Sequence, residues 1–261
     1  MCSSDLRFVH LYLNGLYWGL YNLVERPDAT FAAGALGGKA KEFEARNADK
    51  LIQGNDRVFR EVFRIVNEGI TSFDSYKRVS ELVDLDAFAD FMLLNLYGAN
   101  ADWDRSSNWY AIRRIGDGGR LVFIVWDGER TLENVEDNTL PDDDDLSPTR
   151  LFQKLRTRSE FLKIFSERAR VHLTGNGVLT PERAGARYRK WVSQLDGPIL
   201  AESARWGDYR RDVHPYKEGP YELYTRETHW RPETRRLLQE YFPARTAAFV
   251  RQLQAAGLYQ E

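Results

Sequence analysis

The chain has 261 residues, with 37 Lys and Arg against 39 Asp and Glu, and its formal net charge is -2. This near balance argues against a nucleic-acid binder that works through a strongly basic surface. Cys2 is the only cysteine, which excludes internal disulfides and cysteine-built metal sites. The longest fully apolar stretch, residues 121–126, is far shorter than the roughly 20 residues that span a bilayer. Composition thus predicts a globular chain without a membrane span.

The first six residues, MCSSDL, show no periodicity and match what the end of a common sequencing adapter would encode. We therefore expect residues 1–6 to be a non-native leader on an N-terminally truncated protein. A disordered native N-terminus is the alternative explanation.

The first strong pattern is a β-hairpin over residues 7–13 and 16–24, because Asn14-Gly15 suits a type I′ turn between two β-rich runs. Asp28 is expected to cap a short helix that ends at residue 33. Residues 39–54 are mostly polar, and we expect a loop or insertion there.

Helical spacing of apolar residues predicts three helices, over about 56–67, 73–83 and 84–98. A second hairpin is expected over 109–114 and 120–126, because a glycine-rich turn separates two strand-like runs. The remainder is expected to be helical over about 148–173, 181–206, 232–241 and 244–256, with a break at Pro243.

The candidate metal-binding and catalytic residues are expected at one end of the second hairpin. Asn108 lies just before its first strand and Asp127 just after its second, and these ends are neighbours in an antiparallel pair. The preceding loop adds Asp102 and Asp104. Amide and carboxylate oxygens suit Mg²⁺ or Mn²⁺ better than zinc, and carboxylates beside a divalent cation are typical of phosphoryl transfer.

The order of the predicted elements repeats the C-terminal part of the protein-kinase plan. There, a catalytic-loop Asp and Asn precede a short hairpin, and a metal-binding Asp follows it. We therefore expect an α+β fold with a β-hairpin remnant of an N-terminal lobe and a mainly helical lobe. The expected parts are an N-lobe hairpin and hinge (7–27), a catalytic region (28–146) and a helical C-terminal part (147–261).

Several separated motifs of this sequence resemble the spore-coat kinase (CotH) family. They are Asn14-Gly-Leu-Tyr-Trp-Gly19-Leu-Tyr21 with Glu25, Asn100-x-Asp102-Trp ending in Asn108-Trp-Tyr110, Trp126-Asp127, Glu202-Ser-Ala-Arg-Trp-Gly-Asp208, and Tyr241-Phe-Pro-x-Arg245 with Gly257-Leu-Tyr259. The resemblance implies an atypical, protein-kinase-like fold. It also implies phosphate transfer from ATP to proteins, with a requirement for Mg²⁺ or Mn²⁺.

By position, the resemblance implies that Asn108 and Asp127 bind the metal. The family's catalytic Asp usually precedes its Asn by five residues, whereas Asp102 precedes Asn108 by six and Asp104 by four. Either carboxylate is therefore a candidate for the base. Glu129 stands where the family commonly has a second metal-binding carboxylate.

The topology makes residues 23–26, with Val24 and Glu25, the expected hinge that binds adenine through its backbone. The family's upstream strands and phosphate-binding Lys have no counterpart in this sequence. The leading expectation is an ATP-dependent Ser/Thr protein kinase of surface or coat proteins, with ATP and a protein substrate as partners. The alternative is a non-catalytic pseudokinase or a structural module of the spore coat or cell surface. The residues themselves do not indicate a location; the resemblance is compatible with an extracytoplasmic or spore-surface one.

Overall fold

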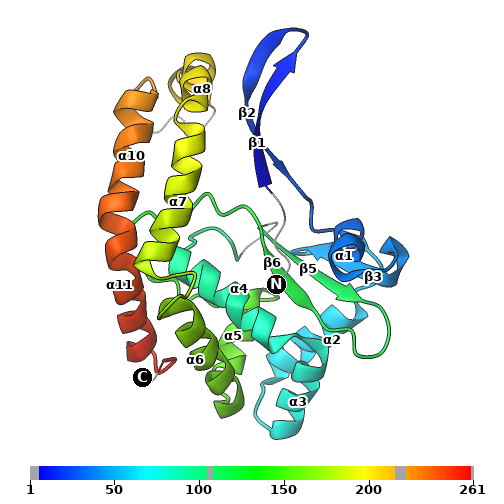
Figure 1. The fold of residues 1–261 in the computed structure, drawn as a ribbon. Helices are drawn as coiled ribbons and strands as arrows, with labels where there is room; N and C mark the ends of the chain where they lie inside the picture. The colour runs from blue at the N-terminus through cyan, green and yellow to red at the C-terminus, as the bar shows by residue number, and fades with distance from the viewer. Residues whose placement is uncertain (1–5, 105–107, 215–221, 260–261) are drawn as a thin grey trace. The chain divides into compact units, whose positions relative to one another are not determined.

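The computed structural model describes residues 6–104, 108–214 and 222–259, and Figure 1 shows the fold. The chain forms two compact units. Of the described residues, 26–104, 108–180 and 245–259 belong to the first unit, and 6–25, 181–214 and 222–244 belong to the second. The predicted leader, residues 1–6, falls outside the described residues except for Leu6. No helix in the described ranges is both long and apolar enough to cross a membrane.

The first unit contains a mixture of strands and helices. In chain order they are α1 (Ala29–Leu36), the 3-10 helix η1 (Ala40–Glu42), β3 (Phe43–Asn47), β4 (Lys50–Gln53), α2 (Arg57–Glu68), α3 (Phe73–Leu82), α4 (Leu85–Gly98), β5 (Trp109–Arg114), β6 (Val122–Val125), α5 (Pro148–Leu155) and α6 (Ser159–Leu173).

The second unit contains a hairpin and several helices. They are β1 (Leu6–Leu13), β2 (Leu16–Val24), α7 (Pro181–Leu195), α8 (Pro198–Trp206), α9 (Tyr209–Asp212), the π-helical turn η2 (Arg226–Trp230), α10 (Arg231–Arg236) and the π-helical turn η3 (Leu237–Tyr241). Helix α11 (Phe242–Ala255) begins in the second unit and belongs to the first from Arg245 onward.

An antiparallel sheet in the order β4-β3-β5-β6 organises the first unit. Side chains alternate along β5, as the strand period of two requires. Trp109 and Ala111 join the large apolar core formed with α2 to α6, whereas Tyr110 and Ile112 pack with Ala29 and Ala32 on the side of α1. Both faces of the sheet are therefore covered, and the hairpin β5–β6 is held rigidly.

Aromatic packing and an ion-pair cluster position α4. Phe88 lies 5.2 Å from Phe123 of β6, measured between ring centroids. On another part of the helix, the Asp90 carboxylate accepts hydrogen bonds from Arg168 at 2.6 and 2.7 Å and lies 2.7 Å from His172 Nε2. These bonds hold the pKa of Asp90 below its usual value against the opposing effect of burial. Helix α4 is thus fixed against both β6 and α6.

The α+β fold class is confirmed, and both predicted hairpins form. Asn14 and Gly15 have φ values of 51° and 79°, which are the left-handed values of a type I′ turn. The helices expected over about 56–67, 73–83 and 84–98 form as α2, α3 and α4. Asp84 caps α4 by accepting a hydrogen bond from the Ala87 N–H at 3.1 Å.

The expected loop over residues 39–54 is wrong, because this segment contains β3 and β4. Two of its charged residues, Glu44 and Arg46, have partners elsewhere in the fold. Glu44 pairs with Arg113 of the neighbouring strand at 3.0 Å, and the Arg46 guanidinium lies 3.4 Å from the ring centroid of Phe59. Such tertiary partners allow polar residues in a buried strand, and the sequence of the segment itself does not reveal them.

The C-terminal helices differ from the prediction in where they are interrupted. The helix expected over 148–173 is divided into α5 and α6, and the one expected over 181–206 into α7 and α8. The break expected at Pro243 does not occur, since Pro243 lies in the first turn of α11 directly after η3. The Phe242 N–H bonds to the Leu237 carbonyl, and this wider turn accommodates the proline ring.

In the second unit, α8 packs against β2. The Trp206 indole N–H donates to the Trp18 carbonyl at 2.6 Å, and the Leu20 N–H donates to Glu202 Oε2 at 2.6 Å. Gly19 lies between these contacts, and a Cβ atom there would be 3.1 Å from Trp206 Nε1. The lack of a side chain at residue 19 therefore permits the close approach of helix and strand.

Arg245 is fully buried in the first unit. Its guanidinium donates to the Tyr97 and Leu96 carbonyls at 2.7 and 2.8 Å and to the Val135 and Asp137 carbonyls at 2.6 and 2.9 Å. The first two are carbonyls at the C-terminal end of α4, where a positive charge is favourable. Arg245 thus ties the end of α4 to the loop that follows β6.

Replacing Arg245 by Met is expected to lower the free energy of unfolding by about 3 kcal/mol or more, because buried carbonyls lose their donors. Arg251→Met in the same helix is the matched control. Its side chain is 62% exposed and pairs with Glu136, so its effect should stay within about 0.5 kcal/mol. Urea unfolding of both variants measures the difference, and equal losses would contradict the role of Arg245.

Candidate functional site

Two loops of the first unit lie side by side. One follows α4 and contains Asp102, and the other follows β6 and contains Asp127 and Glu129. The Ala101 N–H donates to the Arg130 carbonyl at 3.0 Å, and the Leu132 N–H donates to the Gly98 carbonyl at 2.9 Å. The structure therefore brings together two acidic segments that are separated in the sequence.

Asn108 and Asp127 lie at the same end of the β5–β6 hairpin, because Trp109 pairs with Val125. The Asn108 side-chain amide donates to the Asp102 carbonyl. This bond links Asn108 to the loop of Asp102 and uses an amide N–H, so the amide oxygen remains as an acceptor or ligand. The hairpin thus places an amide oxygen and a carboxylate at one end, as the pattern predicts.

Asp127 and Glu129 form an exposed carboxylate pair. A hydrogen bond between the two side chains raises the pKa of Glu129, with a smaller contribution from its partial burial. Two acidic groups at hydrogen-bonding distance disfavour double ionisation, and a bound cation would relieve this repulsion. The pair therefore has the properties of a cation-binding site.

Asp102 and Asp104 have different environments, although only Trp103 separates them. Trp103 is buried and packs against Phe91 with ring centroids 5.5 Å apart, which anchors the loop in the core. Asp102 is exposed. The hydrogen bond that Arg130 donates to Glu133 contributes most to the raised pKa of Arg130, and the charge of Asp102 adds to it. The Asp102 carboxylate is therefore open to solvent beside the loop of Asp127.

Asp104 is only 6% exposed, and its carboxylate accepts hydrogen bonds from both the Thr149 hydroxyl and the Thr149 N–H, the latter at 3.2 Å. Burial raises the pKa of Asp104 to about 6, against the opposing effect of these hydrogen bonds. Asp104 thus joins the loop to the first turn of α5. It also lines a cavity of about 750 Å³ together with Trp109 and Ser147.

Three residues in the paired loops have left-handed backbones although none is glycine. Ala99, Asp127 and Leu132 have φ values of 46°, 54° and 63°. Such conformations cost free energy, and they concentrate at functional sites where surrounding contacts impose them. Here the bonds between the two loops and the contacts of Arg245 supply that constraint.

Val24 and Glu25, the expected adenine-binding residues, belong to the second unit, whereas Asp102 and Asp127 belong to the first. Val24 ends β2 and pairs with Leu6. Among the described residues, no group of three or more His, Cys, Asp or Glu side chains is arranged to hold a metal ion. A site for a cation here therefore depends on Asp127 and Glu129 with Asn108.

Sequence reasoning missed the residues that support the site. Asn95 accepts a hydrogen bond from the Asn100 amide at 3.2 Å, and the Asn100 oxygen accepts one from the Asp102 N–H at 3.4 Å. Asn95 is a polar residue on the apolar, buried face of α4, and its place in that apolar spacing is the sequence signal that could have found it. Thr149 gave no comparable signal.

A comparison with protein-family models shows the family of this chain. Residues 1–248 match the family described as CotH kinase protein. A search of the curated proteins finds no match. The α+β architecture with small antiparallel sheets is consistent with a CotH kinase-like fold.

The raised pKa of Asp104 predicts a pH dependence of stability. Because the folded state binds this proton more tightly than the unfolded state, stability should fall as pH rises from about 4 to about 6. Relative to Asp104→Asn, the wild type should lose about 3 kcal/mol across this range and change little above it. Urea titrations of both proteins from pH 4 to pH 8 measure the difference, and parallel profiles would be the contradictory result.

Proposed function

Because the chain belongs to the CotH kinase family, we propose that it is an ATP-dependent protein kinase that transfers phosphate to Ser or Thr hydroxyls of surface or coat proteins. Family membership itself suggests a kinase that uses ATP and a divalent metal. The observation that supports the finer proposal is the meeting of the Asp102 loop with the Asp127–Glu129 pair at one end of the β5–β6 hairpin.

The donor set fits Mg²⁺ or Mn²⁺. Asp127, Glu129 and Asn108 offer only hard oxygen ligands, which these cations prefer. Mg²⁺ in particular is usually held by one or two carboxylates together with substrate phosphates, so a complete protein cage is not required. When bound, the cation would neutralise charge on the ATP phosphates.

We propose Asp102 rather than Asp104 as the residue that orients and deprotonates the acceptor hydroxyl. The Asp102 carboxylate is exposed beside the Asp127 loop, whereas the Asp104 carboxylate is buried and engaged by Thr149. A base must reach the proton that it removes, and the exposed carboxylate of Asp102 is accessible to a hydroxyl of another protein. Asp104 then acts as a positioning residue that holds the loop on α5.

In the proposed reaction, the acceptor oxygen forms a bond to the γ-phosphorus of ATP while the bond to the ADP oxygen breaks. Asp102 takes the hydroxyl proton. Asn108 keeps the Asp102 loop in place through its bond to the Asp102 carbonyl. Phosphoryl transfer depends mainly on such positioning and on charge neutralisation.

A pseudokinase or structural module is the second candidate. The six-residue interval between Asp102 and Asn108 and the glutamate at position 129 depart from the family's usual pattern, and both departures favour it. Nucleotide binding without transfer identifies a pseudokinase. The absence of nucleotide binding identifies a structural role at the spore coat or cell surface.

Two site variants are expected to separate binding from transfer. ATP with Mg²⁺ or Mn²⁺ should raise the Tm of the wild type, and Asp127→Ala should abolish both this rise and transfer of labelled phosphate. Asp102→Asn should keep the Tm rise and lower the transfer rate by about 10²–10⁴-fold. Asp117→Asn, at the other end of the same hairpin, is the matched control and should behave as the wild type. Transfer retained by Asp127→Ala would refute the assignment.

We propose the end of β2 as the segment that contacts adenine. At the end of β2, the backbone of residues 23–26, including Val24 and Glu25, is proposed to form hydrogen bonds to the base. Val24→Pro removes one backbone N–H and should weaken ATP binding at least about tenfold. Calorimetric titration with ATP measures this change, and circular dichroism checks that the hairpin is retained. Unaltered affinity would contradict the hinge.

A further inference from the structure

The second unit contains a cavity of about 470 Å³ that the proposed phosphate transfer does not use. Its walls come from α7, α8 and the segment of η2 and α10. Its lining includes four aromatic side chains and one carboxylate for which the described part of the chain shows no ion pair: Tyr188, Trp206, Tyr224, Trp230 and Glu202. The cavity therefore combines aromatic surfaces with one negative charge.

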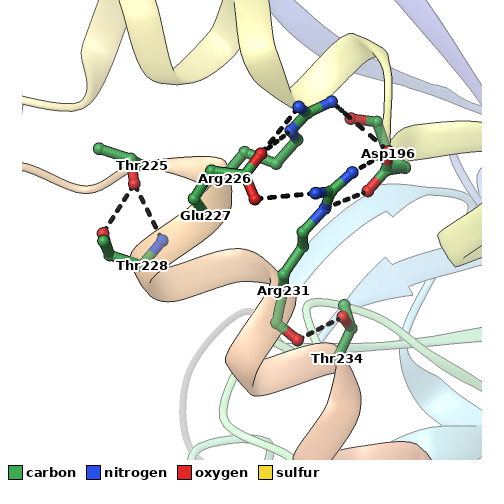
Figure 2. A network of polar contacts seen from close by, with 7 residues as sticks. All are labelled: Asp196, Thr225, Arg226, Glu227, Thr228, Arg231 and Thr234. Carbon is green, nitrogen blue, oxygen red and sulfur yellow. Dashed lines mark hydrogen bonds and ion pairs between the residues drawn. The ribbon is translucent and has the colours of Figure 1, made fainter.

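A polar network fixes two walls of the cavity relative to each other (Figure 2). Asp196, at the junction of α7 and α8, accepts two hydrogen bonds from Arg231, both at 2.9 Å. Arg231 also donates to Glu227 at 2.8 Å, and Arg226 donates to the Asp196 carbonyl at 3.2 Å. These bonds hold η2 and α10 near the junction of α7 and α8. Thr225, which precedes η2, and Thr234 of α10 both line the cavity.

A close backbone contact fixes the edge near Tyr224. The Tyr224 N–H donates to the Gly207 carbonyl at 2.8 Å. A Cβ atom on Gly207 would lie 2.4 Å from the Tyr224 carbonyl oxygen, so only glycine permits this approach. The contact places the Tyr224 ring at the mouth of the cavity, where the residue is 38% exposed.

Glu202 supplies the charge. One of its oxygens accepts the Leu20 N–H at 2.6 Å, and within the described residues no Lys, Arg or His lies at ion-pairing distance from it. Glu233, the other acidic lining residue, is already paired with Arg236 at 2.6 Å. The second oxygen of Glu202 is therefore the site at which an external cation would gain most.

The aromatic walls suit a cation as well. Ring faces attract guanidinium and ammonium groups within about 6 Å of their centroids. This unit already contains one such contact, since the Arg205 guanidinium lies 4.0 Å from the Trp206 ring centroid and 5.1 Å from that of Trp18. Arg205 does not line the cavity.

We propose that this cavity binds a Lys or Arg side chain of a basic polypeptide segment, with Glu202 pairing the cationic group and the rings packing against its stem. Small ligands are usually enclosed on most sides. The lining residues Tyr224 and Glu233 are exposed to solvent, so this cavity is open on their side. A side chain that its own polypeptide anchors does not need such enclosure. The proposal concerns partner binding and stands whether or not the protein transfers phosphate.

The test is calorimetric titration with a capped decapeptide of alternating Lys and Ser, compared with peptides that have Glu or Leu in place of Lys. The Lys peptide alone should bind, with a Kd that rises with salt. Glu202→Gln should raise this Kd about tenfold without changing the Tm, because the amide oxygen still accepts the Leu20 N–H. Glu182→Gln, an exposed site on α7, is the matched control and should leave the Kd unchanged.

Several results would overturn the proposal. They are no binding of the Lys peptide, equal binding of the Leu or Glu peptide, or an unchanged Kd in Glu202→Gln. If free butylammonium binds as tightly as the peptide, the cavity is a site for a small cation instead. Should Glu202→Gln lower the Tm, Tyr224→Leu at the exposed mouth replaces it and should weaken peptide binding several-fold.

Discussion

The burial of the Arg245 guanidinium is the constraint on which the candidate site depends. A buried charge is costly unless all its donors are used, and here four carbonyl groups accept from it. Two of these end α4 and two belong to the loop that follows β6. One residue of α11 therefore links the segment that leads to Asp102 with the loop that follows Asp127. This link helps to maintain the left-handed conformations of Ala99 and Leu132.

Antiparallel pairing made part of this site predictable. Once residues on both sides of a glycine-rich turn form a hairpin, Asn108 and Asp127 must lie at the same end, and the pairing of Trp109 with Val125 places them there. The role of Arg245 was not predictable, because its partners are backbone carbonyls with no sequence signature. Strands β3 and β4 were missed for a related reason, since Glu44 and Arg46 depend on partners far along the chain.

The choice between Asp102 and Asp104 shows the same limit at a finer scale. Their intervals to Asn108 differ from the usual spacing by one residue each, so spacing alone favours neither carboxylate. Packing creates the difference, because Trp103 enters the core and leaves one carboxylate exposed and the other facing Thr149. Burial then raises the pKa of Asp104 to about 6, which makes it a costly charge in a structural position.

Two motifs that resemble the family, around Gly19 and around Glu202 to Asp208, contact each other in the second unit. A purely structural explanation accounts for Gly19, which lets α8 approach β2, and for the Trp206 N–H, which donates to Trp18. For Glu202 it accounts for one oxygen, which accepts a charge-assisted hydrogen bond from the Leu20 N–H, and leaves the second oxygen without a role. A bound cation would give the second carboxylate oxygen a partner, and the aromatic rings of the adjoining cavity provide the remaining surface for it.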